Sequence, residues 1–111
     1  PLVFLLLREN ATVTVCHSRT PDLGHLTCQA EILIAAAGRA GLVTREMVRP
    51  GAAVVDAGLS ATPDGMRGDV DFAGVSEVAG WISPVPGGVG ALTTAILLGN
   101  VLKAAAKAAD G

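Results

Sequence analysis

The feature that most restricts the fold is a set of short apolar runs, each closed by glycine or a polar residue. The clearest are "EILIAAAG" at residues 31–38 and "AAVVDAG" at residues 52–58. A continuous apolar run of this length predicts a strand buried on both faces, because a half-solvated strand alternates apolar and polar residues. Such strands are typical of parallel sheets covered by helices, so the sequence favours an α/β fold.

The composition agrees with such a sheet. Half of the 111 residues are hydrophobic and only 3% are aromatic, so the core must consist of Val, Leu, Ile and Ala. The net charge is −2 and the eight basic residues are scattered, which excludes a nucleic-acid-binding face. The apolar run at residues 1–7 is too short to span a bilayer, and no membrane partner is predicted. Cys16 and Cys28 are predicted to be buried thiols, which indicates a reducing cytoplasm.

The order of elements gives the topology. Strands are predicted at residues 11–18, 31–38, 52–58 and 81–83. Helices are predicted at residues 1–10, 20–30, 42–51, 72–80 and 92–109, with a polar, glycine-rich loop at 60–71. This alternation predicts parallel strands joined by right-handed crossovers. The first helix is apolar on most faces, which predicts that it is buried and that the chain starts inside a fold.

Four polar or glycine-rich segments follow the predicted strands. They are residues 16–20, 35–41, 56–61 and 83–90. Parallel α/β sheets bind ligands beyond the carboxyl ends of their strands, so these segments are expected to meet at one edge and form a binding site.

The segment "CHSRT" offers an anion site. The hydroxyl of Ser18 and the planar guanidinium of Arg19 suit a phosphate, such as the 2′-phosphate that distinguishes NADP from NAD. The alternative is an ordinary polar turn, in which Thr20 or Asp22 caps the next helix.

The next two strand ends combine glycine with an acid. Gly38 can adopt positive φ and let a ligand approach the backbone, although a tight turn explains it equally well. Asp56 is either a catalytic acid or base, or an acceptor of backbone N–H groups, and the second role is favoured. Gly58 and Leu59 could press against a flat ring.

Asp69 and Asp71 in "GDVDF" lie at a spacing that places both carboxylates on one face of an extended segment. A metal or acid–base pair is conceivable, but no third ligand lies nearby. Surface-loop and N-cap roles are the simpler interpretation, and no metal site is predicted. His25 is expected to be an exposed helix residue.

The loop "PVPGGVG" is the most informative segment. Pro84 and Pro86 stiffen it, and either X–Pro bond could be cis. Gly87 and Gly88 leave bare backbone. The loop leads into a helix whose free N–H groups favour an anion or carbonyl, and a threonine hydroxyl in its first turn, from Thr93 or Thr94, can face the same cleft.

Four segments together resemble a known family: "NATVTVCHSRT", "PGAAVVDAGL", "GDVDF" and "ISPVPGGVGALTTAILLGN". They are similar to the nucleotide-binding half of FolD-type bifunctional methylenetetrahydrofolate dehydrogenase/methenyltetrahydrofolate cyclohydrolases, from Pro1 to about Lys103. The resemblance implies a Rossmann-type, doubly wound parallel sheet without its first strand and glycine-rich turn. Residues 1–111 would be an amino-terminally truncated NADP-binding domain, and the folate-binding catalytic domain would be absent.

The resemblance also implies a function. The cytoplasmic enzyme would use NADP to oxidise 5,10-methylenetetrahydrofolate to the 5,10-methenyl form and hydrolyse it to 10-formyltetrahydrofolate, in one-carbon metabolism and purine biosynthesis. The full protein would be a homodimer. The substrate is a tetrahydrofolate derivative.

Site residues follow from the same resemblance. Ser18 would meet the 2′-phosphate, with His17 and Arg19 beside it. The other implied cofactor contacts are Ala37, Gly38, Gly58, Leu59 and Thr93, the last two near the nicotinamide. The implied wall of the folate cleft is Pro86, Gly87, Gly88, Val89 and Gly90.

The sequence departs from the family pattern in places. Ala91 replaces a usual proline, which makes the entry into the last helix less rigid, and Leu59-Ser60 replaces Ile-Asn. The chain has no tyrosine, and its only lysines, Lys103 and Lys107, lie on the terminal helix. No catalytic residue is therefore assigned. The alternative function is a catalytically incompetent nucleotide-binding or assembly module.

Overall fold

The structure is a computed structural model that describes residues 2–110, without the side chains of residues 91, 93–95, 97, 99, 101 and 107–110. The elements in chain order are α1 (Leu2–Arg8), α2 (Leu23–Thr27), β1 (Ile32–Ala35), the 3₁₀ helix η1 (Arg45–Met47), β2 (Ala53–Asp56), β3 (Ser60–Thr62), β4 (Gly65–Arg67), α3 (Phe72–Ser76), β5 (Trp81–Ile82) and α4 (Val89–Asp110).

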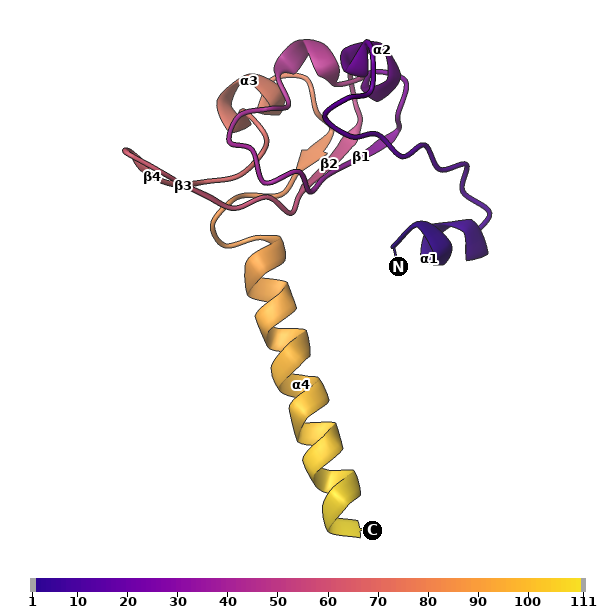
Figure 1. Cartoon of the computed structure of the whole chain (residues 1–111), viewed down its shortest axis with the longest axis vertical. Helices are drawn as coiled ribbons and strands as arrows, with labels where there is room; N and C mark the ends of the chain where they lie inside the picture. Colours follow the sequence, from indigo (N-terminus) through magenta and orange to yellow (C-terminus); the bar gives the residue numbers. More distant parts are fainter. Residues whose placement is uncertain (1, 111) are drawn as a thin grey trace.

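A parallel sheet forms the centre of the fold. Its order is β1-β2-β5, with Ile34 opposite Val55 and Val54 opposite Ile82. Figure 1 shows α2, η1 and α3 on one side of this sheet, whereas α1 and α4 extend from the other side. The predicted α/β class and the parallel strands are confirmed.

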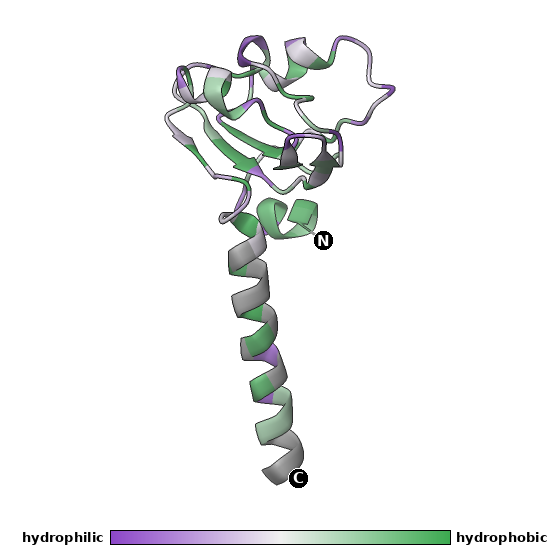
Figure 2. Cartoon of the chain, turned by 90° about the vertical axis from the view of Figure 1, so that its left-hand side faces the viewer, coloured by the Kyte–Doolittle hydropathy of each residue, from purple (hydrophilic) through white to green (hydrophobic). Residues whose placement is uncertain are grey.

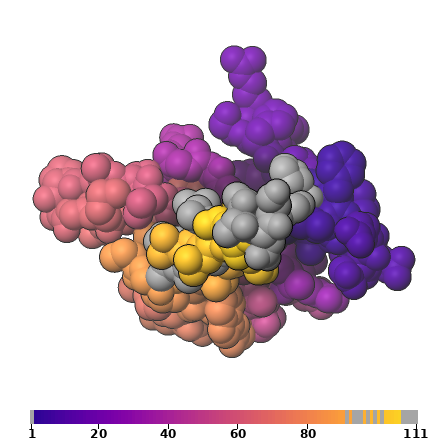
Figure 3. Space-filling view, turned by 90° about the horizontal axis from the view of Figure 1, so that it is seen from below, coloured from indigo at the N-terminus to yellow at the C-terminus, as the bar shows by residue number. Residues whose placement is uncertain are grey.

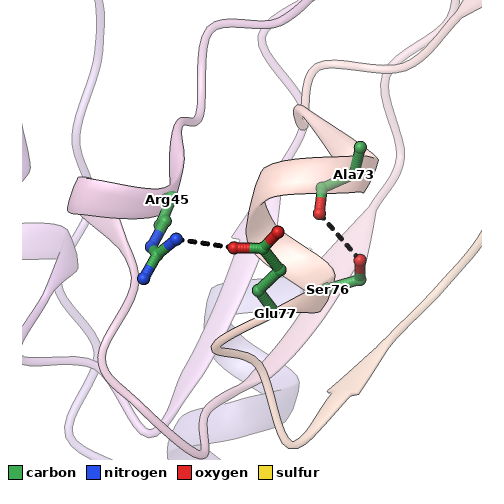
Figure 4. A network of polar contacts seen from close by, with 4 residues as sticks. All are labelled: Arg45, Ala73, Ser76 and Glu77. Atoms are coloured by element: carbon green, nitrogen blue, oxygen red, sulfur yellow. Dashed lines mark hydrogen bonds and ion pairs between the residues drawn. The ribbon is translucent and has the colours of Figure 1, made fainter.

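The core lies between the sheet and the helices above it. Its buried apolar residues are small: Ala35, Val43, Val48, Ala52, Val54, Val70 and Val75. At the surface, Arg45 of η1 pairs with Glu77 just after α3, and the Ser76 hydroxyl donates to the Ala73 carbonyl (Figure 4). Because both charged side chains of that pair are more than half exposed, we attribute the η1–α3 packing to the valines.

The helix predicted at residues 42–51 is shorter than expected. Only η1 forms, with Thr44 at the N-cap position but without a side-chain capping bond. Arg49 precedes Pro50, which disfavours helical backbone at Arg49, and Gly51 then adopts a φ of 83°. These two constraints turn the chain directly into β2.

The strand predicted at residues 11–18 is wrong in this structure. Residues 11–17 are not in a sheet, because no described segment pairs with them, and an apolar alternating sequence becomes a strand only beside a partner. The loop predicted at residues 60–71 is also partly wrong. It contains an antiparallel hairpin, β3–β4, in which the Thr62 hydroxyl donates to the Gly65 carbonyl at 2.7 Å. Figure 3 shows this hairpin projecting as an arm.

The predicted burial of α1 is likewise not found. None of its residues is buried, and the Phe4 side chain is 72% exposed; Figure 2 shows the helix as almost wholly hydrophobic. Strand β1 is covered on one face only, since Ile32 is 60% exposed. Both results have one physical cause: no described element packs over these surfaces.

The dimensions reflect this uncovered surface. The radius of gyration is 16.4 Å, against about 13 Å for a compact chain of this length. The accessible surface is 7913 Å², against about 5,700 Å² for a compact protein of this mass. Helix α4 accounts for much of the difference, because it extends alone from the sheet (Figure 1).

Two further features concern the cysteines and the hydropathy of the helices. Cys16 and Cys28 are free thiols, as predicted, but both are half-buried, whereas full burial was expected. None of the helices within residues 2–110 combines the length and the hydropathy that a bilayer span needs.

Replacement of Val54 tests the position of the core. Val54 is fully buried in β2, whereas Val15 is 68% exposed in the segment without a partner. We expect Val54→Ala to lower the free energy of unfolding by about 2 kcal/mol, because it leaves a cavity, and Val15→Ala to change it much less. Denaturant titration measures both values, and equal effects would contradict the assigned core.

The uncovered surface predicts self-association of the isolated 111-residue chain. The free edge of β1 and the apolar faces of α1 and α4 offer contacts to a second copy. Sedimentation velocity over a range of concentrations should show concentration-dependent association. A monomer at all concentrations, with one sharp thermal transition, would contradict this expectation.

Candidate functional site

Three of the four predicted segments meet at the carboxyl edge of the sheet. The Ala57 N–H donates to the Ala35 carbonyl at 2.7 Å, which joins the ends of β1 and β2. The Asp56 N–H donates to the Ser83 hydroxyl at 2.8 Å, which joins the ends of β2 and β5. The fourth segment, residues 16–20, follows no strand in this structure, so the sheet does not position it.

Asp56 has the structural role that the sequence favoured. Its buried carboxylate accepts the N–H groups of Gly58 at 2.9 Å, Asp69 at 3.0 Å and Val70 at 3.0 Å. Three N–H donors compensate the loss of hydration of a buried carboxylate. The interaction therefore fixes the chain after β2 and holds the segment after β4 against it.

Asp69 was predicted in a surface loop, and this prediction is wrong. Its side chain is fully buried, and its carboxylate accepts N–H groups from Ala37 at 2.6 Å, Gly38 at 3.1 Å and Arg39 at 2.7 Å. The physical reason is a long-range pairing: the Val43 N–H donates to the Asp69 carbonyl at 2.9 Å, and Val43 forms a parallel bridge with Val70. This pairing draws the segment into the molecule.

Two glycines make room for these carboxylates. A Cβ atom at Gly58 would overlap the Asp69 carboxylate, and one at Gly68 would overlap the Asp56 carboxylate. This signal was available in the sequence, because Gly58 stands two residues after Asp56 in "DAG" and Gly68 stands directly before Asp69 in "GDVD". A glycine beside an aspartate at a strand end indicates close approach of other atoms as well as a turn.

Asp71 occupies the N-cap position of α3, as predicted, but its side chain makes no capping bond. Asp71 is exposed whereas Asp69 is fully buried, so the pair predicted at Asp69 and Asp71 does not form a common face. Among the residues that the structure describes, no group of three or more His, Cys, Asp or Glu side chains is arranged to hold a metal ion.

Residues 17–20 form a compact turn. The His17 carbonyl accepts the Thr20 N–H at 3.0 Å, and the Thr20 hydroxyl accepts the His17 N–H at 2.9 Å. The Arg19 N–H donates to His17 Nδ1 at 3.1 Å. The N-cap position of α2 belongs to Asp22, which has a φ of 51° and no side-chain capping bond. The alternative interpretation of this segment, a polar turn, is thus correct for its backbone.

The side chains at the tip of this turn are available to bind a ligand. Ser18 and Arg19 are exposed, and within the described part of the chain the Ser18 hydroxyl and the Arg19 guanidinium have no hydrogen-bond or ion-pair partner. A hydroxyl and a guanidinium presented together on a hydrogen-bonded turn suit a phosphate group.

The loop at residues 83–90 leads from β5 into α4. The Val85–Pro86 peptide bond is cis, and Gly87 has a φ of 102°. Gly88 lies so close to the Pro84 carbonyl that a Cβ atom would overlap it. Helix α4 begins at Val89, three residues before the predicted start. The side chains of Thr93 and Thr94, named as candidate contacts, lie outside the described part.

The predicted contact residues form an open edge and not an enclosed cavity. A pocket of about 410 Å³ lies where β4, α3 and the loop after β5 approach one another, and Asp56, Arg67, Phe72 and Val85 are among its lining residues. A smaller pocket near Arg49 is at the amino end of β2. Neither is lined by the residues predicted to bind the cofactor or the folate.

Relatives of known identity resemble this chain over almost its whole length. A bifunctional protein FolD 2 of Desulfitobacterium hafniense is 66% identical over 103 residues, which are 93% of this chain and 36% of that protein. A bifunctional protein FolD of Pelotomaculum thermopropionicum is 60% identical over 105 residues, with 94% and 37% coverage. The chain thus spans little more than a third of the length of these relatives.

Comparison with solved structures agrees with these sequence matches. The bifunctional FolD enzyme of Campylobacter jejuni matches with a TM-score of 0.87 and 47% identity over 93% of this chain and 37% of that one. The methylenetetrahydrofolate dehydrogenase-cyclohydrolase (FolD) of Trypanosoma brucei, complexed with NADP cofactor and inhibitor, matches with a TM-score of 0.79 and 44% identity over 88% and 36%. The Rossmann-like fold is confirmed.

The sequence profile of the family "Tetrahydrofolate dehydrogenase/cyclohydrolase, NAD(P)-binding domain" matches residues 1–109. This match covers the turn at residues 17–20, the three strand ends and the glycine-rich loop. The chain therefore belongs to the tetrahydrofolate dehydrogenase/cyclohydrolase family and corresponds to its NAD(P)-binding domain.

Proposed function

We propose that this chain is the NADP-binding domain of an enzyme that oxidises 5,10-methylenetetrahydrofolate to 5,10-methenyltetrahydrofolate and hydrolyses that product to 10-formyltetrahydrofolate. The observation that carries the proposal is the family match over residues 1–109, together with the exposed Ser18 and Arg19 side chains, which have no partner among the residues that the structure describes. The complex of the Trypanosoma brucei relative with NADP supports the choice of cofactor.

The residues present fit the cofactor in two respects. Ser18 and Arg19 supply a hydroxyl donor and a planar cation for the 2′-phosphate, with His17 holding the turn that presents them. At the sheet edge, Gly38 has a φ of 71° and open space where a side chain would lie, so a ligand can approach the backbone there. Ala37, Gly58, Leu59 and Thr93 are the further contacts that we propose.

The roles of this chain in the reaction are binding and orientation. NADP, when bound, accepts a hydride from the one-carbon group of the folate. Gly87 has a φ of 102° and open space where a side chain would lie, and Pro86, Gly88, Val89 and Gly90 flank it on the proposed folate side, so a flat pterin ring can lie against the loop. Hydride transfer needs no base from this chain. The cyclohydrolase step needs side chains that we assign to a folate-binding domain.

The larger assembly is part of the proposal. Because the chain spans about 36% of its curated relatives, we propose that residues 1–111 act as an NADP-binding domain with a folate-binding catalytic domain in the same protein. The full protein would be a cytoplasmic homodimer that serves one-carbon metabolism and purine biosynthesis. The exposed apolar faces of α1 and α4 leave surface for such contacts.

The activity itself is tested with the full-length gene product. We expect reduction of NADP in the presence of 5,10-methylenetetrahydrofolate, followed as absorbance of the reduced cofactor. Tight NADP binding without turnover would favour the alternative, a nucleotide-binding or assembly module without catalysis. Absence of both binding and turnover would refute the proposed function.

Substitution of Arg19 tests the 2′-phosphate contact. In the full-length protein, Arg19→Ala should raise KM for NADP about tenfold, because a charge-assisted bond to the phosphate is lost, and should change KM for NAD much less. Arg8→Ala, which changes another exposed arginine without an ion pair among the described residues and outside the proposed site, is the matched control. Equal increases for the two cofactors would refute the role of Arg19.

A further inference from the structure

Two of the segments proposed to contact the cofactor are joined by one side chain. Ala37, Gly38 and Arg39 all donate their N–H groups to the Asp69 carboxylate. Gly58 packs against the same carboxylate, so closely that a methyl group would not fit. Asp69 therefore contacts both the segment after β1 and the segment after β2.

The direction of these hydrogen bonds limits what the segment after β1 can bind. A run of consecutive N–H groups is an anion-binding concavity when it faces a ligand. Here all three N–H groups face inward to a carboxylate, and they are not available to a phosphate. The negative charge of Asp69 also lies directly beneath the segment, which further disfavours an anion. A ligand at Gly38 is left with carbonyl groups and bare backbone surface.

The residue Asp69 is itself held in place by a second buried carboxylate, that of Asp56. Its own N–H donates to the Asp56 carboxylate at 3.0 Å, and Asp56 binds Ser83 through its N–H. The chain of contacts thus runs from the end of β5 through Asp56 and Asp69 to the end of β1. Ser83, Asp56 and Asp69 are buried, so water competes little for the bonds that join them, whereas residues 37–39 donate to Asp69 from the exposed side.

We propose that Asp69 is a positioning residue for cofactor binding: through three backbone N–H groups and its contact with Gly58, it fixes residues 37–39 and 58–59 in one binding surface, which accepts the non-phosphate part of the dinucleotide. This inference rests on the proposed function. It assigns Asp69 no contact with cofactor or substrate. The phosphate-binding and ring-binding parts of the site are then separate, with the first at Ser18 and Arg19 and the second under the control of Asp69.

The test compares two ligands in the full-length protein. Calorimetry measures the Kd of NADP and of adenosine 2′,5′-bisphosphate, which carries the 2′-phosphate but lacks the nicotinamide half. In Asp69→Asn, an amide replaces one acceptor oxygen with a donor that faces N–H groups. We expect the Kd of NADP to rise about tenfold, which is the loss of one such bond, and the Kd of the bisphosphate to change less than twofold.

A matched control removes a charge elsewhere. Asp64→Asn alters an exposed carboxylate at the tip of the β3–β4 hairpin, whose only recorded partner in the described chain is Arg67 at 3.6 Å. It should leave both Kd values unchanged. If Asp69→Asn weakens both ligands equally, its role is general stability and the proposal is wrong. If it weakens neither, the proposal is also wrong. If the unmodified protein binds neither ligand, the proposed function itself fails.

Hydrogen–deuterium exchange of the unmodified protein decides the question if Asp69→Asn does not fold. The amides of residues 37–39 should exchange slowly without cofactor, since they donate to Asp69, and their protection should change little when NADP is added. Peptides covering residues 17–20 should gain protection with NADP. Fast exchange of residues 37–39 that slows on NADP binding would show that these amides bind the cofactor, and would overturn the proposal.

Discussion

The arrangement of the sheet edge depends on two buried carboxylates. Asp56 and Asp69 each accept three backbone N–H groups. A buried charge without such partners is strongly destabilising, so the segments that supply the donors cannot move independently. The loops after β1, β2 and β4 are consequently fixed by two side chains, beside a core whose buried apolar residues are all small.

This constraint separates a rigid part of the site from an adaptable part. The surface formed by residues 37–39 and 58–59 is held by hydrogen bonds and contacts to the buried carboxylates of Asp56 and Asp69, whereas the turn at residues 17–20 is closed only by its own local hydrogen bonds. Its side chains are free to meet a phosphate. Helices α1 and α4 contribute apolar faces and no buried contact among the side chains described (Figure 2). Binding specificity and assembly are thereby assigned to different surfaces of the chain.

The sequence predicted those elements whose signal is local. The apolar runs that became β1 and β2, the acceptor role of Asp56 and the glycines of the loop after β5 follow from neighbouring residues alone. The sequence did not predict the features that depend on pairing between separate segments of the chain. Residues 11–17 have the composition of a strand but no partner among the described segments, and Asp69 is buried only because Val43 pairs with Val70. The hairpin β3–β4 was missed because a polar, glycine-rich segment resembles a loop until its two halves pair.

The most direct test of the account is a crystal structure of the full-length protein with NADP. We expect a 2′-phosphate oxygen within about 3 Å of the Ser18 hydroxyl and of the Arg19 guanidinium, while the N–H groups of residues 37–39 remain on the Asp69 carboxylate. A 2′-phosphate bound elsewhere, or those N–H groups turned outward to the cofactor phosphates, would contradict it.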